Sequence, residues 1–418
     1  MRLLCLSNGH GEDAIATRII HQLLNLPDPP EINALPLVGE GQAYIDAKIP
    51  IIGPVKSMPS GGFIYMDGRQ LAQDVRGGLL QLAWQQYKTI RAWAKDGGTV
   101  LAVGDLVPLL FAWLSGLDYG FVATAKSEYW IRDEAGPLPG SFTQGWSGSV
   151  YLPWERWLMG RKKCKAVFPR DRLTAETLQE YSLPIFDLGN PMMDDLQNPA
   201  TDSDDAGDER RSLCFLLLPG SRTGEAYSNW EILLTAIAQI LGEPKPFPIL
   251  HRPVEFLGAI SPGLSIETFG QILESYGWRR SAEPEENATE SICYTLGNGT
   301  LFLSQNSYAQ YLHRADVALA MAGTATEQFV GLGKPAIAIP GSGPQFTPEF
   351  ARVQAKLLGP SLILVDNPRA VPSTLQEVLQ DPDRLQLIYA NGRRRMGLPG
   401  AAERIALCCQ EKFWAIGG

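Results

Sequence analysis

Residues 216–225 read LLLPGSRTGE, and residues 318–340 read ALAMAGTATEQFVGLGKPAIAIP. Each stretch is an apolar run that ends at glycine and continues through small hydroxylated residues into a helical pattern that carries a glutamate. Such a strand, turn and helix leave free backbone N–H groups at the helix N-terminus, where they bind phosphate or diphosphate. Two of these elements in one half of the chain predict a nucleotide-sugar site.

Two charged residues have direct roles in that prediction. Arg222 presents a planar fork of donors that matches phosphate oxygens and would neutralise charge on a departing diphosphate. Glu327 lies one helical turn into the second helix, from where it would bind ribose hydroxyls. An Arg222–Glu225 ion pair and an ordinary first-turn glutamate are the alternative interpretations. The donor-binding residues predicted from the two stretches are Gly220, Ser221, Arg222, Gly323, Thr324 and Glu327.

The composition is that of a globular protein with more than one domain. A chain of 418 residues is too long for a single hydrophobic core. Its 45% hydrophobic and 19% charged residues argue against disorder, and its net charge of -9 argues against nucleic acid as a partner. We expect no signal peptide, because residues 1–6 are a short predicted strand that runs directly into a glycine loop. We expect no membrane-spanning helix, because no apolar stretch approaches about 20 residues. The six cysteines lack zinc-like spacing, and Cys5 and Cys214 lie in predicted buried strands, the usual place for a reduced structural thiol in a cytoplasmic protein.

Short apolar runs alternate with helical patterns in both halves, which favours parallel, doubly wound sheets. The predicted strands are residues 3–6, 32–37, 49–52, 99–103, 120–124, 166–168, 185–188, 212–218, 247–250, 300–303, 317–320, 336–339 and 362–365. Residues 197–211, QNPATDSDDAGDERR, are polar and acidic and are predicted to be a linker. We therefore expect an N-terminal acceptor domain (1–196), a nucleotide-sugar domain (212–400) and a final helix (401–418) that crosses back to the N-terminal domain.

This organisation predicts an α/β fold of the GT-B type. Two Rossmann-like domains with parallel sheets would hold the ligand in an interdomain cleft, at the carboxyl ends of the strands. The fold does not fix the reaction, because it hosts glycosyltransferases, nonhydrolysing epimerases and some phosphorylases. The carboxylates Asp194 and Asp195, beside the linker, are expected to be solvated.

Two residues are candidates for the base that deprotonates an acceptor hydroxyl. His10 lies in the glycine-rich segment SNGHGED after the first strand, and an imidazole titrates near neutral pH. Asp105 follows the buried strand at 99–103. The alternatives are that His10 caps the first helix and that Asp105 is an N-cap, with Pro108 just inside its helix. Glu12 and Asp13 are interpreted as first-turn charges that complement the helix dipole.

Residues 146–165, WSGSVYLPWERWLMGRKKCK, interleave aromatic and basic residues. Tryptophan beside lysine and arginine is typical of a surface that contacts a membrane interface. The alternative is that the tryptophans pack a helix against the sheet while the basic residues are solvated. The apolar residues 106–114 would either line an acyl pocket or form a buried helix. The predicted acceptor and membrane residues are Trp154, Trp157, Arg161, Lys162 and Lys163.

Four segments resemble bacterial lipid-A-disaccharide synthase, in the same order along nearly the whole chain. They are LLPGSRTGE, ADVALAMAGTATEQFVGLGKPAIAIP, SNGHGEDAIATRI and KAVFPRDRLTAETLQEYSLPIFDLGNPMMD. The first loop departs from the synthase, which carries a Gly-Glu-x-Ser-Gly-Asp type sequence where this chain has Asn8 to Asp13. A Gly-His pair at this point is more like the lipid-linked N-acetylglucosaminyltransferase of peptidoglycan synthesis and the galactolipid synthases.

The resemblance implies uridine as the base of the donor, Asp105 as the catalytic base, and Gln345 and Phe346 closing over the sugar or the nucleobase. The predicted function is an inverting, metal-independent and cofactor-free transfer of an N-acetylglucosamine-type sugar or hexose. The sugar would pass from a UDP-sugar to a lipid acceptor, by a cytoplasmic protein peripheral on the inner face of the plasma membrane. The alternatives are a nonhydrolysing UDP-N-acetylglucosamine 2-epimerase and a catalytically inactive nucleotide-binding protein of the same fold.

Overall fold

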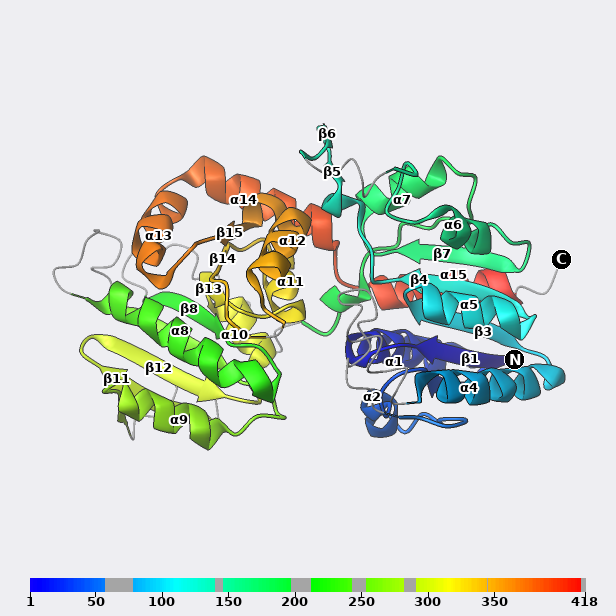
Figure 1. Cartoon of the computed structure of the whole chain (residues 1–418), viewed down its shortest axis with the longest axis horizontal. Helices are drawn as coiled ribbons and strands as arrows, with labels where there is room; N and C mark the ends of the chain where they lie inside the picture. Colours follow the sequence, from blue (N-terminus) through cyan, green and yellow to red (C-terminus); the bar gives the residue numbers. More distant parts are fainter. Residues whose placement is uncertain are drawn as a thin grey trace. The chain divides into compact units, whose positions relative to one another are not determined.

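A computed structural model describes residues 1–56, 78–139, 146–196, 212–242, 253–281, 291–343 and 345–414. The chain forms two compact units (Figure 1), of which unit 1 is Met1–Asp194 with Gly397–Gly418 and unit 2 is Asp195–Met396. The final helix, α15 (Ala401–Trp414), is therefore part of unit 1. The predicted linker at 197–211 lies outside the described residues.

Unit 1 is built on a five-stranded sheet whose strands are all parallel, as predicted. The strands are β1 (Arg2–Ser7), β2 (Glu31–Pro36), β3 (Thr99–Gly104), β4 (Asp118–Ala123) and β7 (Cys164–Pro169), in the order β2-β1-β3-β4-β7. The predicted strands at 49–52 and 185–188 are wrong, because each forms only a single bridge, Ala34 with Ile51 and Val167 with Ile185. A proline precedes each bridge, and proline cannot donate to a strand ladder.

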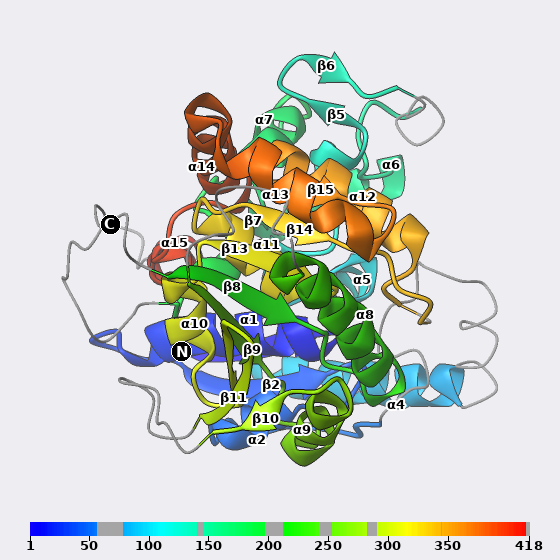
Figure 2. The same ribbon diagram turned by 90° about the vertical axis from the view of Figure 1, so that its left-hand side faces the viewer.

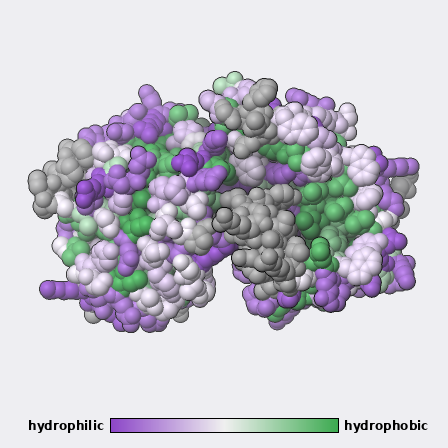
Figure 3. All heavy atoms as spheres, in the orientation of Figure 1, coloured by the Kyte–Doolittle hydropathy of each residue, from purple (hydrophilic) through white to green (hydrophobic). Residues whose placement is uncertain are grey.

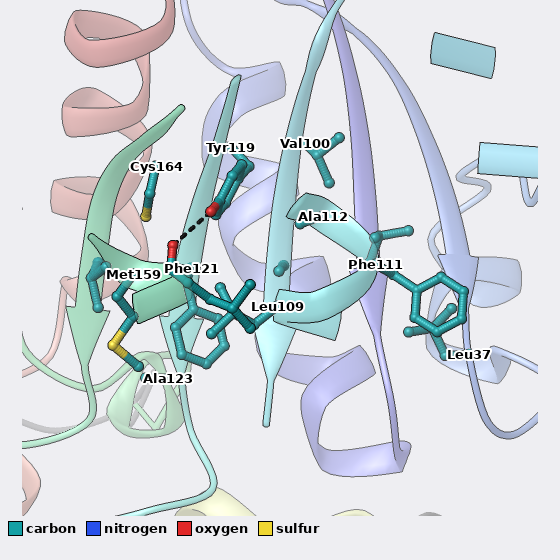
Figure 4. Close-up of a cluster of buried hydrophobic side chains, with 14 of the residues drawn as sticks. Leu37, Val100, Leu109, Phe111, Ala112, Tyr119, Phe121, Ala123, Met159 and Cys164 are labelled. Atoms are coloured by element: carbon teal, nitrogen blue, oxygen red, sulfur yellow. Dashed lines mark hydrogen bonds between the residues drawn. The ribbon is translucent and has the colours of Figure 1, made fainter. Parts of the chain in front are cut away.

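Helices cover both faces of this sheet. They are α1 (His10–Leu24), α2 (Gln42–Asp46), α4 (Leu79–Trp93), α5 (Leu106–Ser115), α6 (Pro153–Met159) and α7 (Arg172–Gln179), with short 3-10 turns η1 (Ala94–Asp96), η2 (Glu128–Trp130) and η3 (Pro191–Met193) and a small hairpin of β5 (Arg132–Asp133) and β6 (Gly136–Pro137). Leu3 packs in the core shared with α1 and α15, whereas Leu4 packs in the opposite core with α5. In that second core the Tyr119 hydroxyl donates to the Leu158 carbonyl at 2.7 Å (Figure 4).

Unit 2 contains an eight-stranded sheet that is parallel except at one edge. Its strands are β8 (Leu213–Leu218), β9 (Val254–Ala259), β10 (Arg279–Arg280), β11 (Ile292–Leu296), β12 (Gly299–Ser304), β13 (Val317–Ala320), β14 (Ala336–Ala338) and β15 (Leu362–Leu364), in the order β10-β11-β12-β9-β8-β13-β14-β15. The pairs β10–β11 and β11–β12 are antiparallel. The sequence did not predict β9, β10 or β11, and the strand predicted at 247–250 lies outside the described residues.

The helices of unit 2 are α8 (Thr223–Leu241), α9 (Ile266–Ser275), α10 (Tyr308–Arg314), α11 (Thr324–Gly331), α12 (Pro348–Leu358), α13 (Val371–Leu379) and α14 (Pro382–Met396), with 3-10 turns η5 (Gly359–Ser361) and η6 (Pro368–Ala370). Figure 2 shows α8 beside β8. Gly258 in β9 gives room for this packing, because a Cβ there would lie 3.2 Å from the ring of the buried Trp230 of α8. The glycine also weakens the strand pattern, which explains why β9 was missed.

Both sheets have a topological switch point. In unit 1 the chain passes from β1 to β2 on one side and later to β3 on the other side of β1. In unit 2 it passes from β8 to β9 and β12, and then to β13 on the other side of β8. Ligands of doubly wound folds bind at the carboxyl ends of the strands that flank such a point. The loops after β1, β3, β8 and β13 therefore occupy the positions of interest.

Candidate functional site

The two predicted diphosphate-binding loops flank the switch point of unit 2. Gly220 follows β8 in a left-handed conformation, with φ of 96°. A Cβ at this position would lie 3.2 Å from the Met321 carbonyl oxygen at the end of β13. Glycine therefore satisfies both the backbone conformation and the close approach of the two loops. Ser221, beside it, is exposed.

The helices that begin at these loops have no side-chain cap. The N-cap residues of α8 and α11 are Arg222 and Gly323, and neither can cap its helix through a side chain, because a guanidinium has no acceptor and glycine has no side chain. In the same unit, the hydroxyls of Ser265 and Thr347 do cap α9 and α12. Among the described residues, the first two N–H groups of α8 and of α11 have no hydrogen-bond partner. Four donors are thus available to an anion at the positive ends of two helix dipoles.

The charged residues of the two loops are partly withdrawn from solvent. Arg222 is half-buried, and this burial lowers the pKa of its guanidinium, against the opposing effect of Glu225. Glu225 is itself buried, and its Oε2 accepts bonds from the backbone N–H groups of Gln345 at 3.0 Å and Phe346 at 3.2 Å. The carboxylate is therefore bound to a third loop, a contact that the Arg222–Glu225 interpretation did not foresee.

That third loop follows β14, so the predicted donor residues come from three strands that are adjacent in the order β8-β13-β14. Phe346 is buried, with its ring centroid 5.6 Å from that of Phe350, whereas Gln345 is half-buried. In the α11 loop, Thr324 is exposed and Glu327 is half-buried. Gln354 of α12 fixes this loop by donating to the carbonyls of Ala322 at 3.2 Å and Gly323 at 3.0 Å.

The loops after β1 and β3 bring His10 and Asp105 to the switch point of unit 1. His10 is the first residue of α1 and is exposed. Its imidazole has no hydrogen-bond partner within the described ranges. Asp105 is buried and accepts a bond from Val107 N–H at 2.7 Å, as the N-cap of α5. Burial raises the pKa of Asp105, while the bonds from Val107 and Asn8 lower it.

Gly104 allows the β1 and β3 loops to approach each other. Its φ is 134°, and a Cβ would collide with the Oδ1 of the buried Asn8. The same Oδ1 has no hydrogen-bond partner in the described part of the chain. Asn8 was not predicted as a site residue, although its place directly after β1, two residues before His10, was a usable signal.

Glu12 and Asp13, which the sequence treats alike, lie in different environments. Burial raises the pKa of Glu12, and the nearby Asp105 raises it further. Asp13 is buried on the sheet side, where Ser7 Oγ donates to its Oδ1 at 2.6 Å. Burial raises the pKa of Asp13 to about 7, although the Ser7 bond opposes this shift. Both are acidic residues in the first turn of α1, as predicted, but the burial of Asp13 and its bond from Ser7 were not foreseen.

Further charged groups that sequence reasoning missed lie after β4 and β7. Lys126 Nζ contacts both carboxylate oxygens of Glu155, at 2.7 and 2.6 Å, and both side chains are largely withdrawn from solvent. Arg170 donates to the Thr124 carbonyl at 3.1 Å. Because β3, β4 and β7 are parallel neighbours, these groups lie along the same sheet edge as Asp105.

The aromatic and basic segment forms α6 and the turn after it. Trp154 and Trp157 are 51% and 47% exposed, so neither indole is a core residue. Trp157 meets Trp113 of α5 edge-on, with ring centroids 5.4 Å apart. The Arg161 guanidinium lies over the Trp157 ring at 4.1 Å. Lys162 is exposed, and Lys163 donates to the Gly116 carbonyl.

The expectation of a solvated Asp194 is wrong. Asp194 is buried, and its carboxylate accepts bonds from the N–H groups of Gly400, Ala401 and Ala402 at 2.7, 3.1 and 2.6 Å. It therefore caps α15 in unit 1. Across the described ranges, no helix has the length and apolar character needed to cross a bilayer.

Comparison with known proteins identifies the fold. No family model and no curated protein matches the chain. Among solved structures, the calicheamicin glycosyltransferase CalG4 matches with a TM-score of 0.58 and 14% identity over 100% of both chains. MurG of Acinetobacter baumannii gives 0.55 and 14%, covering 98% of this chain and 99% of its own. UDP-GlcNAc 2-epimerase of Neisseria meningitidis, bound to UDP-GlcNAc, gives 0.54 and 13%, over 98% and 100%.

At these identities the likeness concerns the fold alone. The chain has the α/β, two-domain GT-B fold that the sequence predicted. The resemblance to lipid-A-disaccharide synthase remains a hypothesis about function.

Proposed function

We propose that this protein is an inverting glycosyltransferase, similar to lipid-A-disaccharide synthase, that moves a sugar from a UDP-sugar to a lipid acceptor. The observation that carries the donor half is the pair of uncapped helix N-termini, α8 and α11, at the switch point of unit 2. A diphosphate there would accept bonds from the free N–H groups and from Arg222, so the proposed transfer needs no metal ion or cofactor. Glu327 would bind the ribose.

The acceptor half of the proposal rests on the switch point of unit 1. In an inverting transfer the acceptor oxygen bonds to the anomeric carbon while the bond from that carbon to the diphosphate breaks. The acceptor proton passes to a base, and the diphosphate leaves with the electron pair. His10 is the better placed base, because its imidazole is exposed and unbonded whereas Asp105 caps α5. Arg222 would stabilise the charge that develops on the diphosphate.

A lipid acceptor fits the surface formed by α4, α5 and α6, which we call the three-helix face. The helix α5 is apolar around its whole circumference, yet Leu110 is 36% exposed. Leu80 and Trp84 of α4 and Trp157 of α6 are also exposed, and these helices contact α5. Figure 3 shows hydrophobic side chains gathered over α5. Arg161, Lys162 and Lys163 would add an attraction to anionic headgroups at the inner face of the plasma membrane.

A thermal-shift panel tests the donor half. The purified protein is mixed with UDP, GDP, ADP, UDP-glucose, UDP-galactose and UDP-N-acetylglucosamine. A ligand present at about 100 times its dissociation constant adds about 2.7 kcal/mol of stability, which raises Tm by several degrees. We expect a selective response to uridine nucleotides that is lost in Arg222→Ala. No response to any nucleotide would refute the donor site.

The main alternative is a nonhydrolysing UDP-N-acetylglucosamine 2-epimerase, favoured by the similarity to the Neisseria enzyme. Incubation with UDP-N-acetylglucosamine separates the two reactions. An epimerase forms the C2 epimer in the absence of lipid, whereas the transferase releases UDP only when lipid extract supplies an acceptor. Uridine-nucleotide binding with neither product would identify a catalytically inactive nucleotide-binding protein.

A further inference from the structure

Glu225 accepts hydrogen bonds from a loop that is distant in sequence, in addition to any interaction of its charge with the helix dipole. It is the third residue of α8 and is buried. Its Oε2 accepts two N–H bonds, from Gln345 at 3.0 Å and from Phe346 at 3.2 Å, across about 120 residues of sequence. A buried carboxylate is unfavourable unless such bonds satisfy it, and bonds to a charged acceptor are stronger than neutral ones. The burial of the Glu225 carboxylate therefore requires the N–H groups of the loop after β14, and the backbone of that loop is in turn held by Glu225.

The backbone of that loop is shaped to fit against α8. A Cβ on Gly343 would lie 2.6 Å from the Cβ of Glu225, and a Cβ on Gly341 would lie 2.7 Å from Asn229 Oδ1. Only glycine permits these approaches. The loop is closed by the bond from Gly341 N–H to the Phe346 carbonyl at 3.0 Å.

Asn229 extends the same arrangement to the diphosphate loop. It lies one helical turn after Glu225, is fully buried, and donates from Nδ2 to the Pro219 carbonyl at 3.0 Å. Pro219 directly precedes Gly220. Two side chains on one face of α8 thus fix the loop after β8 and the loop after β14 relative to the helix N-terminus.

We infer that Glu225 is a positioning residue that holds the loop after β14 in its donor-binding conformation. The identity of the ligand rests on the proposed function, whereas the contact between Glu225 and the loop does not. The carboxylate needs no direct contact with the donor, because it acts through the backbone of Gln345 and Phe346. Loss of the acceptor oxygen should free the loop, whereas an amide oxygen at the same place should still hold it.

Three variants test the inference. Glu225→Ala removes the acceptor, Glu225→Gln keeps one acceptor oxygen, and Glu231→Ala is the matched control, because Glu231 is exposed on the same helix. Hydrogen exchange of the peptide that contains Gln345 and Phe346 is measured in the ligand-free protein, after circular dichroism has shown that each variant is folded. We expect exchange to accelerate at least about tenfold in Glu225→Ala, and to stay near wild type in the other two.

The second measurement is the Kd of UDP by calorimetry. We expect Glu225→Ala to weaken binding at least about tenfold, with Glu225→Gln within about threefold of wild type. Unchanged exchange in Glu225→Ala would overturn the positioning role. Faster exchange with unchanged UDP affinity would overturn the link to the donor. If UDP fails to bind wild type, the proposed function fails, while the exchange result still decides whether Glu225 holds the loop.

Discussion

The two candidate bases, His10 and Asp105, differ in the hydrogen bonds that they already accept. The Asp105 carboxylate accepts bonds from Val107 and Asn8, and these hold it at the start of α5. The His10 imidazole has no partner in the described part of the chain. A base needs a free lone pair that can reach the acceptor hydroxyl, so the geometry favours His10.

We therefore predict a different outcome for each base variant. His10→Ala should lower kcat at least about 100-fold, with the Kd of UDP unchanged, because the donor residues lie in unit 2. Asp105→Asn should keep the cap of α5, since asparagine caps as well as aspartate, and should lower kcat less than about tenfold. Steady-state kinetics and Tm of both variants check this. Full turnover in His10→Ala, with loss in Asp105→Asn, would reverse the assignment.

Asp13 predicts a pH dependence of stability. Its carboxyl keeps a proton up to about pH 7 in the folded protein, because burial raises its pKa to about 7, whereas an unfolded chain releases it near pH 3.8. Between these values the folded state binds more protons, so the stability contributed by Asp13 falls as pH rises from about 4 to 7, by a few kcal/mol. Asp13→Asn should flatten this fall. Tm of both proteins at pH 5 and pH 8 tests it, and parallel pH profiles would contradict it.

Sequence reasoning at this scale succeeded where local pattern decides the placement. The turns at Gly220 and Gly323 lie between a strand and a helix, as the adjacent apolar run, glycine and hydroxylated residues predicted, while their donor-binding role stays a prediction. Glu225 and Asp194 were not understood, because their partners lie about 120 and 206 residues away. Nothing in the neighbouring sequence distinguishes a carboxylate that caps a distant segment from one that faces water.

Among the elements, α5 departs most from the usual pattern of a surface helix. A helix that is apolar on all sides is normally enclosed, yet the side of α5 that bears Leu110 is open. The sequence allowed a buried helix or an acyl pocket for residues 106–114. The structure instead shows one side in the core and the other on the three-helix face. Periodicity does not reveal this, because an apolar side chain gives the same pattern in a core and on an exposed face.

The three-helix face leads to a prediction about lipid binding. Trp84→Glu and Leu110→Glu should weaken binding to vesicles that contain anionic phospholipid at least about tenfold, because each places a charge where apolar contact is proposed. Neither should change Tm by more than a few degrees, since both side chains are exposed. Leu387→Glu, at a 55% exposed leucine on α14 of unit 2, is the control. Vesicle co-sedimentation measures binding, and equal binding by all three variants would exclude this face.

For the whole molecule, most parallel strands were predictable, whereas the antiparallel edge of the sheet in unit 2 was not. Most of the buried parallel strands are apolar runs that local pattern identifies, such as β1 and β8, but the central strand β9, which contains Gly258, was missed. The antiparallel pair β10 and β11 is missed, since Arg279–Arg280 is only two residues long and both are exposed. The switch points follow from strand order, which no single segment encodes. Because β8 and β13 are adjacent in that order, the two glycine-containing motifs that follow them, far apart in the sequence, become neighbouring loops.

The chain leaves unit 1 after Asp194 and returns to it after Met396. The helix α15 is therefore joined to the rest of unit 1 by contacts, because the residues before Gly397 in the sequence belong to unit 2. Asp194 supplies three of these contacts through its carboxylate. The helix also buries Ile405, Ala406 and Cys409 against the core that includes α1. Because Cys409 is fully buried, its thiol reports on whether α15 remains docked.

In Asp194→Ala, α15 should therefore detach from the rest of unit 1, in transient local openings, more often than in the wild type. Loss of a charged acceptor from three N–H groups costs about 2–4 kcal/mol, which increases the population of locally open states at least about tenfold. Modification of Cys409 by a thiol reagent, followed by mass spectrometry of its peptide, should accelerate to the same degree. Asp195→Asn is the matched control, because asparagine tolerates the left-handed backbone there, with φ of 62°. If Cys409 reacts at the wild-type rate in Asp194→Ala, hydrophobic packing alone holds α15, and the carboxylate is dispensable for joining the end of the chain to unit 1.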